Sequence, residues 1–378
     1  MRGRQPASAA HALTPRGAVS RLGAVSVEAE LAAALRAVAD GDAPLDFDAW
    51  ALRVFRHQFE RNAPYRTYCE RRGIGPDGVA RWEDVPVVPT RAFRTSDLAC
   101  GPPQAIFRTS GTSGGADARG RHLVPHLDLY RASALPTFAR FVLPDDARLR
   151  CLFLLPPPAA RPDSSLVHMC AWVGDAFGTG TDWFVGPDGL DVERLQDVLA
   201  QHAASGEAIL LGGPTAAFVR LFDVGRPLRL GPGSRLVDTG GQKGMSRPMS
   251  RAGFLRACWS ALGIPTYYCI NEYGMTELCS QRYDSALRDR FDGRSLDARR
   301  LVAPPWLRTR VLDPDTLAPV RSGDVGLLCH HDLANAGSVS VVLTEDLGRA
   351  VGDGLEVVGR VPGAVPRGCG LLLADLAP

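Results

Sequence analysis

Short apolar or β-branched segments alternate with helical segments along most of this chain, and that alternation restricts the possible fold more than any other feature. The strand-like segments are 149–155, 208–211, 235–238, 266–270 and 307–312. Helical segments such as 192–203 and 249–262 lie between them. Strands separated by helices are typical of domains in which helices pack on a sheet, so the sequence predicts a layered α/β fold.

The beginning of the chain has a different character. Apolar residues recur at helical spacing in 25–39 and 47–61, which predicts two amphipathic packing helices. Residues 1–24 are rich in Ala and Arg but lack the apolar run of a signal peptide, so we expect a disordered leader, with an organelle-type presequence as the alternative.

After Gly326 the pattern changes to closely spaced strands at 339–344 and 355–358, with Gly-rich turns between them. This change predicts a division of the chain into a main α/β body, 25–330, and a smaller β-rich C-terminal lobe, 331–378.

The charge balance and the cysteines argue against several classes of function. A formal net charge of +2 gives no long-range field for nucleic acid or for an anionic membrane surface. The nine cysteines form no C-x-x-C pair and are odd in number, which disfavours a zinc knuckle and a complete disulfide framework and fits a reducing cytoplasm. No apolar run reaches the roughly 18 residues of a membrane span, so we expect a cytoplasmic protein without a membrane-spanning segment.

A loop rich in hydroxyls and glycines follows the short strand candidate 104–108. Its backbone N–H groups can approach an anion closely and its hydroxyls can donate further hydrogen bonds, so it could hold phosphate. An ordinary flexible turn is the alternative, and the loop is not a Walker loop because no Gly-Lys-Ser/Thr follows. The loop consists of Thr109, Ser110, Gly111, Thr112, Ser113, Gly114 and Gly115.

The same loop satisfies the G-x-S-x-G pattern of a hydrolase nucleophile elbow, with Ser113 as the nucleophile. An elbow must lead directly into a helix, whereas the segment 121–124 looks extended. The hydrolase hypothesis is therefore disfavoured.

The most specific motif is Asn-Glu-Tyr-Gly-Met-Thr-Glu at 271–277, and the segments 344–348 and 358–360 follow it. In this order the three segments resemble the nucleotide-binding motifs of adenylate-forming enzymes. The resemblance implies their large-domain fold with a truncated C-terminal lobe, and it implies ATP and Mg²⁺ as cofactors. A loop with a buried Tyr and a helix-capping Thr is the alternative for the first segment.

The resemblance also assigns residues. It implies that Tyr273 stacks on adenine, with Gly274 beside it, that Thr276 contacts the α-phosphate and that Glu277 helps to hold Mg²⁺. A ring for a ring, a hydroxyl for a phosphate oxygen and a carboxylate for a hard cation are chemically reasonable pairings. By the same carry-over, Asp346 holds the ribose hydroxyls and Arg360 lies at the hinge and also reaches the ribose.

The chain departs from the usual superfamily pattern after Arg360, because too few residues follow for the mobile C-terminal domain that normally supplies a catalytic lysine. Lys243 is the only lysine among the 43 lysines and arginines, and Arg and Lys are not interchangeable. We expect Lys243 to neutralise the charge that develops at the α-phosphorus, with Gly240 and Gly241 letting the backbone approach the nucleotide. Chance survival on a solvated surface is the alternative.

The tail segment 363–369 ends in Cys369 and resembles the acyl-protein synthetases of bacterial luminescence systems, the LuxE type. The segments 55–59, 162–166 and 332–335 also look like that family. The resemblance implies that a carboxylic acid, by analogy a fatty acid, is activated to acyl-AMP and transferred to Cys369. An acyl reductase would then be the accepting partner protein.

Three alternatives remain open at this level. The acyl group could pass directly to coenzyme A or a carrier thiol, as in acyl- or aryl-CoA ligases. The chain could be a non-catalytic nucleotide-binding partner subunit. Cys369 itself could be a small buried hydrophobic residue, the usual state of a lone cysteine.

Overall fold

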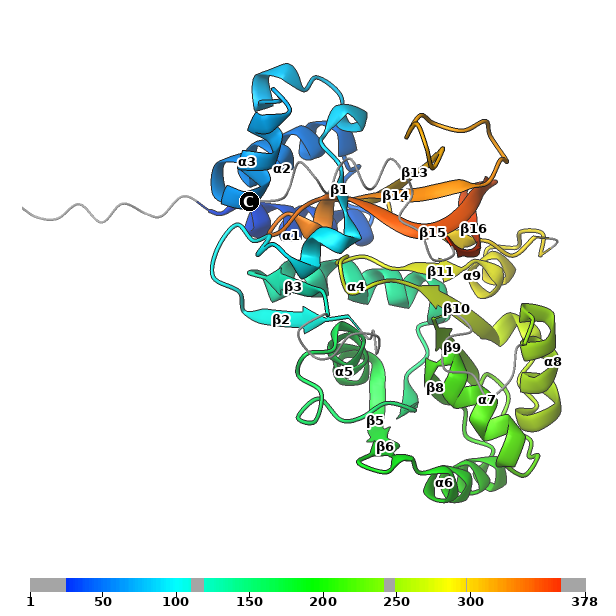
Figure 1. Cartoon of the computed structure of the whole chain (residues 1–378). Helices are drawn as coiled ribbons and strands as arrows, with labels where there is room; N and C mark the ends of the chain where they lie inside the picture. The colour runs from blue at the N-terminus through cyan, green and yellow to red at the C-terminus, as the bar shows by residue number, and fades with distance from the viewer. Residues whose placement is uncertain (1–24, 110–118, 241–248, 297, 362–378) are drawn as a thin grey trace, which may run out of the picture.

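The computed structural model describes residues 25–109, 119–240, 249–296 and 298–361 (Figure 1). The helices are α1 (Val27–Ala39), α2 (Phe47–Arg61), α3 (Ala63–Arg71), α4 (Leu127–Val142), α5 (Ser165–Phe177), α6 (Val192–Ser205), α7 (Thr215–Val224), α8 (Arg251–Leu262) and α9 (Ala286–Phe291). The strands are β1 (Val88–Pro89), β2 (Ala105–Arg108), β3 (Arg121–Val124), β4 (Leu149–Phe153), β5 (Gly178–Trp183), β6 (Val185–Gly186), β7 (Gly189–Leu190), β8 (Ile209–Pro214), β9 (Arg235–Thr239), β10 (Cys269–Tyr273), β11 (Arg282–Asp284), β12 (Leu301–Val302), β13 (Leu307–Leu312), β14 (Gly326–Asp332), β15 (Val341–Val351) and β16 (Gly354–Arg360).

One large mixed sheet organises the molecule, with strand order β13-β14-β15-β16-β12-β11-β10-β9-β8-β4-β5. The half from β10 to β5 is parallel, and the half from β11 to β13 is antiparallel. Strand β10 joins the halves, because it is parallel to β9 and antiparallel to β11. The most specific sequence motif therefore begins on the strand where the sheet changes character.

Helices cover both faces of the parallel half (Figure 1). Alternate residues of a strand point to opposite faces, so Leu210 of β8 packs in the core under α4 and α5, while Leu211 packs in the core under α6, α7 and α8. Burial on both faces explains the nearly continuous apolar runs that the sequence shows in these strands.

The antiparallel half packs against the N-terminal helices. Leu343 of β15 and Cys329 of β14 share a buried cluster with Phe55 of α2 and Tyr65 and Tyr68 of α3. Segments at the two ends of the chain thus meet in one core, which fixes β14 and β15 beside the rest of the sheet.

The predicted α/β fold is confirmed, and several elements match closely. Helix α2 and strand β13 have the predicted bounds, and the predicted extended segment after the loop is β3. The segment 266–268 is instead a turn of 3₁₀ helix, because Pro265 sets up a turn in which the Tyr268 amide donates to the Pro265 carbonyl before β10 begins.

The predicted division at residue 330 falls within β14, which pairs with β13 on one side and β15 on the other. Strand β16 also pairs with β12, so one continuous sheet runs across the division. The two-part organisation stays a prediction, and the predicted leader 1–24 lies outside the described residues.

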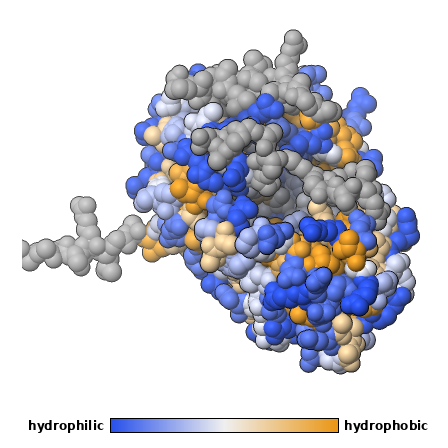
Figure 2. All heavy atoms as spheres, turned by 60° about the horizontal axis from the view of Figure 1, so that its bottom comes forward, coloured by the Kyte–Doolittle hydropathy of each residue, from blue (hydrophilic) through white to orange (hydrophobic). Residues whose placement is uncertain are grey.

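The described surface is mixed in character. Figure 2 shows hydrophobic residues in small separate groups between hydrophilic ones on the face it displays. Among the described residues, no helix has both the length and the apolar composition needed to cross a bilayer.

Candidate active site

Strand β10 and the C-terminal strands bring three sequence motifs into contact. The hydroxyl of Tyr273 donates a hydrogen bond of 2.8 Å to Oδ2 of Asp346 on β15. Nε of Arg360, at the end of β16, donates to Oδ1 of the same carboxylate over 2.8 Å. Asp346 and Arg360 are direct partners in the β15–β16 register, which explains why their side chains meet. The residues predicted to contact adenine and ribose, Tyr273, Asp346 and Arg360, therefore form one polar cluster, which we call the nucleotide cluster.

Neighbouring side chains of β10 point to opposite faces of the strand and make different contacts. Tyr273 faces Asp346 and His330, whose Nε2 lies 3.2 Å from the Tyr273 hydroxyl. Burial, with the charge of Asp346, raises the pKa of Tyr273 well above its usual value, so the phenol stays protonated and can donate. Glu272, one residue earlier, points to the opposite face of the strand and lines a cavity.

Glu277 is a buried carboxyl group with 8% of its surface exposed. Burial raises its pKa to about 7, and the charge of Arg360 opposes that rise only in part. A Cβ placed on Gly120 would lie 3.7 Å from Oε1 of Glu277, so this carboxyl group faces the backbone that leads into β3. Among the described residues Glu277 forms no ion pair.

Thr109 lies beside the same backbone, at Gly120. Its amide donates to the Gly120 carbonyl over 3.1 Å, and the Gly120 amide donates to Oγ1 of Thr109 over 3.0 Å. This pair of bonds closes the β2–β3 hairpin at the base of the predicted phosphate-binding loop. The first residue of that loop and the proposed metal ligand Glu277 consequently share one neighbourhood.

Two polar residues that the sequence analysis did not assign to the site hold the backbone of Thr276 and Glu277. His122 of β3 donates from Nδ1 to the Thr276 carbonyl over 2.6 Å. Asn335 donates from Nδ2 to the Glu277 carbonyl over 2.9 Å, and its Oδ1 lies 2.8 Å from Nε2 of His122. The extended segment 121–124 and the segment 332–335 could be recognised in the sequence, but the contact between them could not be predicted from it.

The end of β9 approaches β10 beside the cavity. The hydroxyl of Thr239 donates to Oε2 of Glu272, and burial raises the pKa of Glu272 to about 7. Gly240 follows with a φ of +86°, a left-handed conformation that favours glycine. Its carbonyl lies 3.2 Å from the hydroxyl of Thr215. Gly240 therefore directly follows the residue that pairs with Glu272 of β10, and its predicted role beside the nucleotide stays a prediction.

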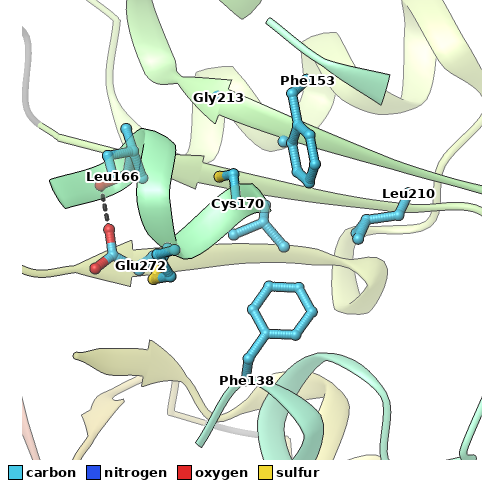
Figure 3. A pocket seen from close by; sticks show the side chains of 11 residues that line it. Phe138, Phe153, Leu166, Cys170, Leu210, Gly213 and Glu272 are labelled. Atoms are coloured by element: carbon cyan, nitrogen blue, oxygen red, sulfur yellow. Dashed lines mark hydrogen bonds between the residues drawn. The ribbon is translucent and has the colours of Figure 1, made fainter. Parts of the chain in front are cut away.

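A small, mostly apolar cavity opens at the carboxyl ends of β4, β8, β9 and β10 (Figure 3). Strand β4 lies between β5 and β8, so the order of the strands reverses here, which is the usual position of a ligand site in a parallel α/β sheet. The apolar lining includes Phe138, Phe153, Leu166, Met169, Cys170 and Leu210. Glu272 and Thr239 are its polar margin.

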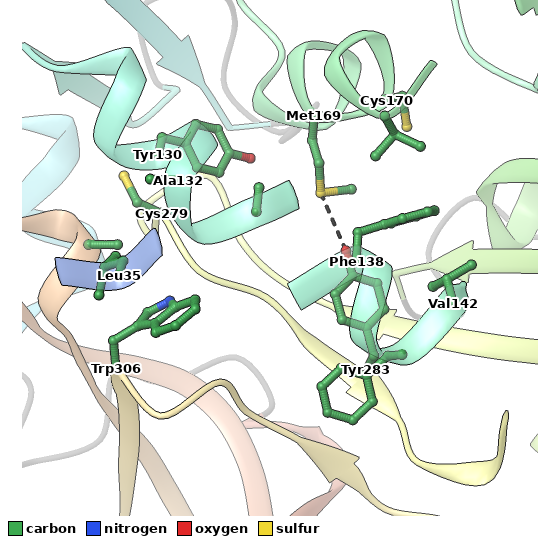
Figure 4. Close-up of a cluster of buried hydrophobic side chains, with 14 of the residues drawn as sticks. Leu35, Tyr130, Ala132, Phe138, Val142, Met169, Cys170, Cys279, Tyr283 and Trp306 are labelled. Carbon is green, nitrogen blue, oxygen red and sulfur yellow. Dashed lines mark hydrogen bonds between the residues drawn. The ribbon is translucent and has the colours of Figure 1, made fainter. Parts of the chain in front are cut away.

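The inner end of the cavity is closed by the main core. Phe138 of α4 lines the cavity and also belongs to the buried cluster of Figure 4. In that cluster the hydroxyl of Tyr283 donates to the sulfur of Met169 over 3.6 Å, and Nε1 of Trp306 donates to Oγ of Ser133 over 2.7 Å. Side chains such as Phe138 and Met169 therefore belong both to the cavity lining and to the main core.

Comparison with known proteins identifies the family. The family model "Acyl-protein synthetase, LuxE" matches residues 32–377. The chain belongs to this family. Two relatives, from Aliivibrio fischeri and Vibrio harveyi, are named long-chain-fatty-acid–luciferin-component ligase. They are 22% identical over 346 residues (87% of this chain, 88% of the relative) and 24% identical over 351 residues (85% of each). This member of the acyl-protein synthetase family is accordingly a ligase, as predicted from the sequence.

The fold agrees with that assignment. A 2-hydroxyisobutyryl-CoA ligase in complex with an acyl adenylate and CoA matches with a TM-score of 0.60 and 17% identity, over 83% of this chain and 74% of the ligase. The synthetase spans about half (54%) of MatB from Rhodopseudomonas palustris, with a TM-score of 0.47 and 18% identity over 76% of this chain. The match to the 2-hydroxyisobutyryl-CoA ligase confirms the predicted fold of adenylate-forming enzymes.

The described residues are compatible with Mg²⁺. No group of three or more His, Cys, Asp or Glu side chains that could hold a metal ion is present in the described part of the synthetase. Mg²⁺ bound together with nucleotide phosphates needs only one or two carboxylates, and Glu277 supplies a buried carboxyl group without an ion pair among the described residues.

Several predicted site residues lie outside the described residues of the synthetase. They are Ser110, Gly111, Thr112, Ser113, Gly114, Gly241, Lys243 and Cys369. Their roles stay predictions. Of the described site residues, Thr109 and Glu277 lie near one another, and Tyr273, Asp346 and Arg360 are in direct contact.

Proposed function

We propose that this synthetase activates a carboxylic acid with ATP and then passes the acyl group to Cys369. In the first step the carboxylate oxygen attacks the α-phosphorus of ATP, the bond from that phosphorus to the bridging oxygen breaks, and pyrophosphate leaves with the bonding electrons. In the second step the Cys369 thiolate attacks the acyl carbon and AMP leaves with the electron pair of the broken acyl–oxygen bond. The thioester is then delivered to an acyl-accepting protein.

The contact between Tyr273, Asp346 and Arg360 is the observation that carries this proposal. Three segments separated in the sequence meet there, and each supplies a group suited to part of a nucleotide. The Tyr273 ring offers a stacking face for adenine. The Asp346 carboxylate can accept hydrogen bonds from ribose hydroxyls, and Arg360 adds a cation beside it.

The proposed acid lies in the apolar cavity. The cavity opens at the end of β10, which also carries Tyr273, so an acid within it would present its carboxylate toward the nucleotide cluster. Apolar walls such as Phe153 and Leu210 favour an alkyl or aryl chain. The curated relatives are named for long-chain fatty acids, which supports a fatty acid as the first substrate to test.

Glu277 is the residue proposed to hold Mg²⁺ beside the phosphates, with Thr109 and Thr276 nearby. The bound ion would neutralise phosphate charge as pyrophosphate leaves. Its ligation requires the ionised carboxylate, so the buried Glu277 must lose its proton when the metal–nucleotide complex binds.

The roles proposed for Lys243 and Cys369 rest on the sequence and on the family resemblance. Lys243 would place an ammonium against the α-phosphate as negative charge develops on it. Cys369 would accept the acyl group, and an acyl reductase is the expected protein to which the group is delivered. The family description of an acyl-protein synthetase supports transfer to a protein.

The first test is a pyrophosphate-exchange assay over a series of carboxylic acids. Wild type should catalyse acid-dependent exchange of labelled pyrophosphate into ATP, with fatty acids among the best substrates. Lys243→Ala should lower exchange on the order of 100-fold, as the loss of one group that stabilises transition-state charge does. ATP binding without exchange for any acid would instead favour a non-catalytic nucleotide-binding subunit.

The second test follows the acyl group. Incubation with ATP and radioactive acid should label wild type in a bond that is stable to acid and cleaved by thiols, and Cys369→Ala should remain unlabelled. Exchange activity should persist in Cys369→Ala, because adenylation precedes transfer. If Cys369→Ala forms acyl-CoA at the wild-type rate, the acceptor is coenzyme A and the protein-transfer step is wrong.

A further inference from the structure

Next to the nucleotide cluster, a chain of buried and partly buried polar groups runs from Arg282 to Asp346. Nη2 of Arg282 lies 2.5 Å from Oγ1 of Thr309, which lies 2.7 Å from Nδ1 of His330. Nε2 of His330 lies 3.2 Å from the hydroxyl of Tyr273, which donates to Asp346. We call these five residues the relay.

The chemistry of the groups gives the relay a single direction. Arg282 can only donate, so Thr309 accepts from it and has its own proton free for Nδ1 of His330. At the other end, the proton of Tyr273 goes to Asp346, so the phenol oxygen accepts from Nε2–H of His330. A neutral imidazole with its proton on Nε2 satisfies both contacts.

The surroundings of His330 support that neutral form. The side chain is fully buried, and burial together with the charge of Arg282 lowers the pKa of His330 to about 3. Arg282 is also buried, with 4% of its surface exposed, and among the described residues it forms no ion pair. A buried charge without an ion pair among the described residues is costly, which points to a role for Arg282 beyond packing.

We propose that Arg282, Thr309 and His330 are positioning residues that orient the Tyr273 hydroxyl and thereby make Asp346 selective for the ribose hydroxyls of ATP. Because His330 donates to Tyr273, the phenol proton is directed away from the imidazole and toward Oδ2 of Asp346. Arg360 fixes Oδ1 of that carboxylate. Both oxygens are therefore held with defined lone pairs for the nucleotide.

Loss of the Thr309 hydroxyl should reverse this order. Without a donor facing Nδ1, His330 can move its proton to Nδ1 and leave Nε2 as an acceptor. Tyr273 would then donate to His330 instead of Asp346, and the carboxylate would lose one of its two anchors. This inference rests on the proposed function only in its placement of ATP ribose against Asp346.

Equilibrium titration with Mg·ATP and with Mg·2′,3′-dideoxy-ATP tests the relay without knowledge of the acid. Wild type should bind ATP about 100-fold more tightly, because the dideoxy nucleotide leaves a buried carboxylate without its ribose donors. Thr309→Val, which keeps the shape of the side chain, should reduce this ratio about tenfold. His330→Leu should do the same, while His330→Gln, which retains a donor, should stay within about threefold of wild type.

His331→Gln is the matched control. His331 is the next residue on β14, is equally buried, faces the other side of the strand and accepts from Nε of Arg310 at 3.2 Å. Its substitution should leave the nucleotide ratio unchanged, and the ratio is insensitive to a smaller folded fraction because both nucleotides need the same fold.

The outcomes separate this inference from the proposed function. An unchanged ratio in Thr309→Val and His330→Leu, with a collapsed ratio in Asp346→Asn, would overturn the relay and leave the ribose site intact. Equal binding of both nucleotides by wild type would overturn the ribose site and the relay together. A reduced ratio in the two relay variants, with His331→Gln like wild type, supports the inference.

Discussion

Glu28 and Glu277 are both buried glutamates, but their surroundings move their pKa values in opposite directions. Glu28 lies on α1 with 3% of its surface exposed, and its Oε1 is 2.8 Å from Nε2 of His57 and 3.4 Å from Nε2 of His126. Burial alone would raise its pKa, yet the hydrogen bond and charges of these histidines lower it to about 2. The pKa of Glu277 is about 7 because burial dominates there.

The difference distinguishes a structural carboxylate from one available for a ligand. Glu28 has its histidine partners inside the protein, so it joins α1 to α2 and to the start of α4. Glu277 has no ion pair among the described residues, and the charge of Arg360 offsets the effect of burial only in part, so a bound cation would stabilise its charged form further. A perturbed carboxyl group in a site is a candidate for function when its partner is missing from the fold.

The largest expected effect is on activity. Glu277→Gln should lower acid-dependent pyrophosphate exchange on the order of 100-fold at saturating Mg²⁺, since it removes the proposed metal ligand. Glu28→Gln, corrected for the folded fraction, should exchange at the wild-type rate. Comparable losses in both variants would contradict the division into ligand-binding and structural carboxyl groups.

The next effect is on stability, and its sign should differ between the two sites. Glu28→Gln should lower the free energy of unfolding at pH 8 by about 2 kcal/mol, because it breaks a buried pair. Glu277→Gln should raise it by about 2 kcal/mol at the same pH, because it removes a charge that the unliganded site disfavours. Urea denaturation of the metal-free and nucleotide-free protein measures both.

The pH dependence provides the control for that measurement. The folded pKa of Glu277 is raised, so its contribution to stability is fully present below about pH 4.5, the unfolded value, and is lost as the pH rises through about 7. The gain in Glu277→Gln should therefore disappear by pH 5. The folded pKa of Glu28 is lowered, so its contribution is present above about pH 4.5 and is lost only as the pH falls toward 2. A gain that persists unchanged at pH 5 would mean that the charge of Glu277 is not its source.

A smaller effect is expected in metal binding. Deprotonation of Glu277 must precede ligation, so the apparent affinity for Mg²⁺ in the exchange assay should rise about tenfold between pH 6 and pH 8 and level off above. In Glu277→Gln, any remaining pH dependence of the apparent Mg²⁺ affinity reflects the titration of the nucleotide itself. The same pH dependence in wild type and Glu277→Gln would remove Glu277 from the metal site.

Local pattern in the sequence was sufficient for much of the fold and for the ends of the nucleotide cluster. Helix α2 follows from periodicity and strand β13 from its apolar and β-branched residues, while the family resemblance implied that Tyr273 and Asp346 bind one nucleotide, and these two side chains are hydrogen-bonded. The supporting groups were not predictable in this way. His122 reaches Asn335 across 213 residues of sequence and His330 reaches Tyr273 across 57, and no local pattern encodes such pairings.

The strand pairing gives the same lesson. The change to closely spaced strands predicts a smaller β-rich terminal lobe but not the pairing partners of its strands, because these depend on the whole sheet, in which β16 pairs with β12. Residues such as Thr309 also look like ordinary strand residues, since Thr is favoured in strands for its shape alone. Its hydroxyl acquires a role only because β13 and β14 place it directly opposite His330.

The smallest expected effect is at Gly120, the backbone wall that Glu277 faces. A methyl group added by Gly120→Ala would lie 3.1 Å from Cγ2 of Thr109, which must shift by a few tenths of an ångström, and 3.7 Å from Oε1 of Glu277, an ordinary van der Waals contact that fills the space beside the carboxyl group. The KM for Mg·ATP should rise about threefold, with a change in unfolding free energy within about 0.5 kcal/mol. Gly101→Ala is the matched control, because its Cβ would meet nothing within 4 Å. Equal KM values for the two variants would show that the space between Gly120 and Glu277 is not used by the metal–nucleotide complex, and Glu277 would then resemble Glu28 in serving the fold alone.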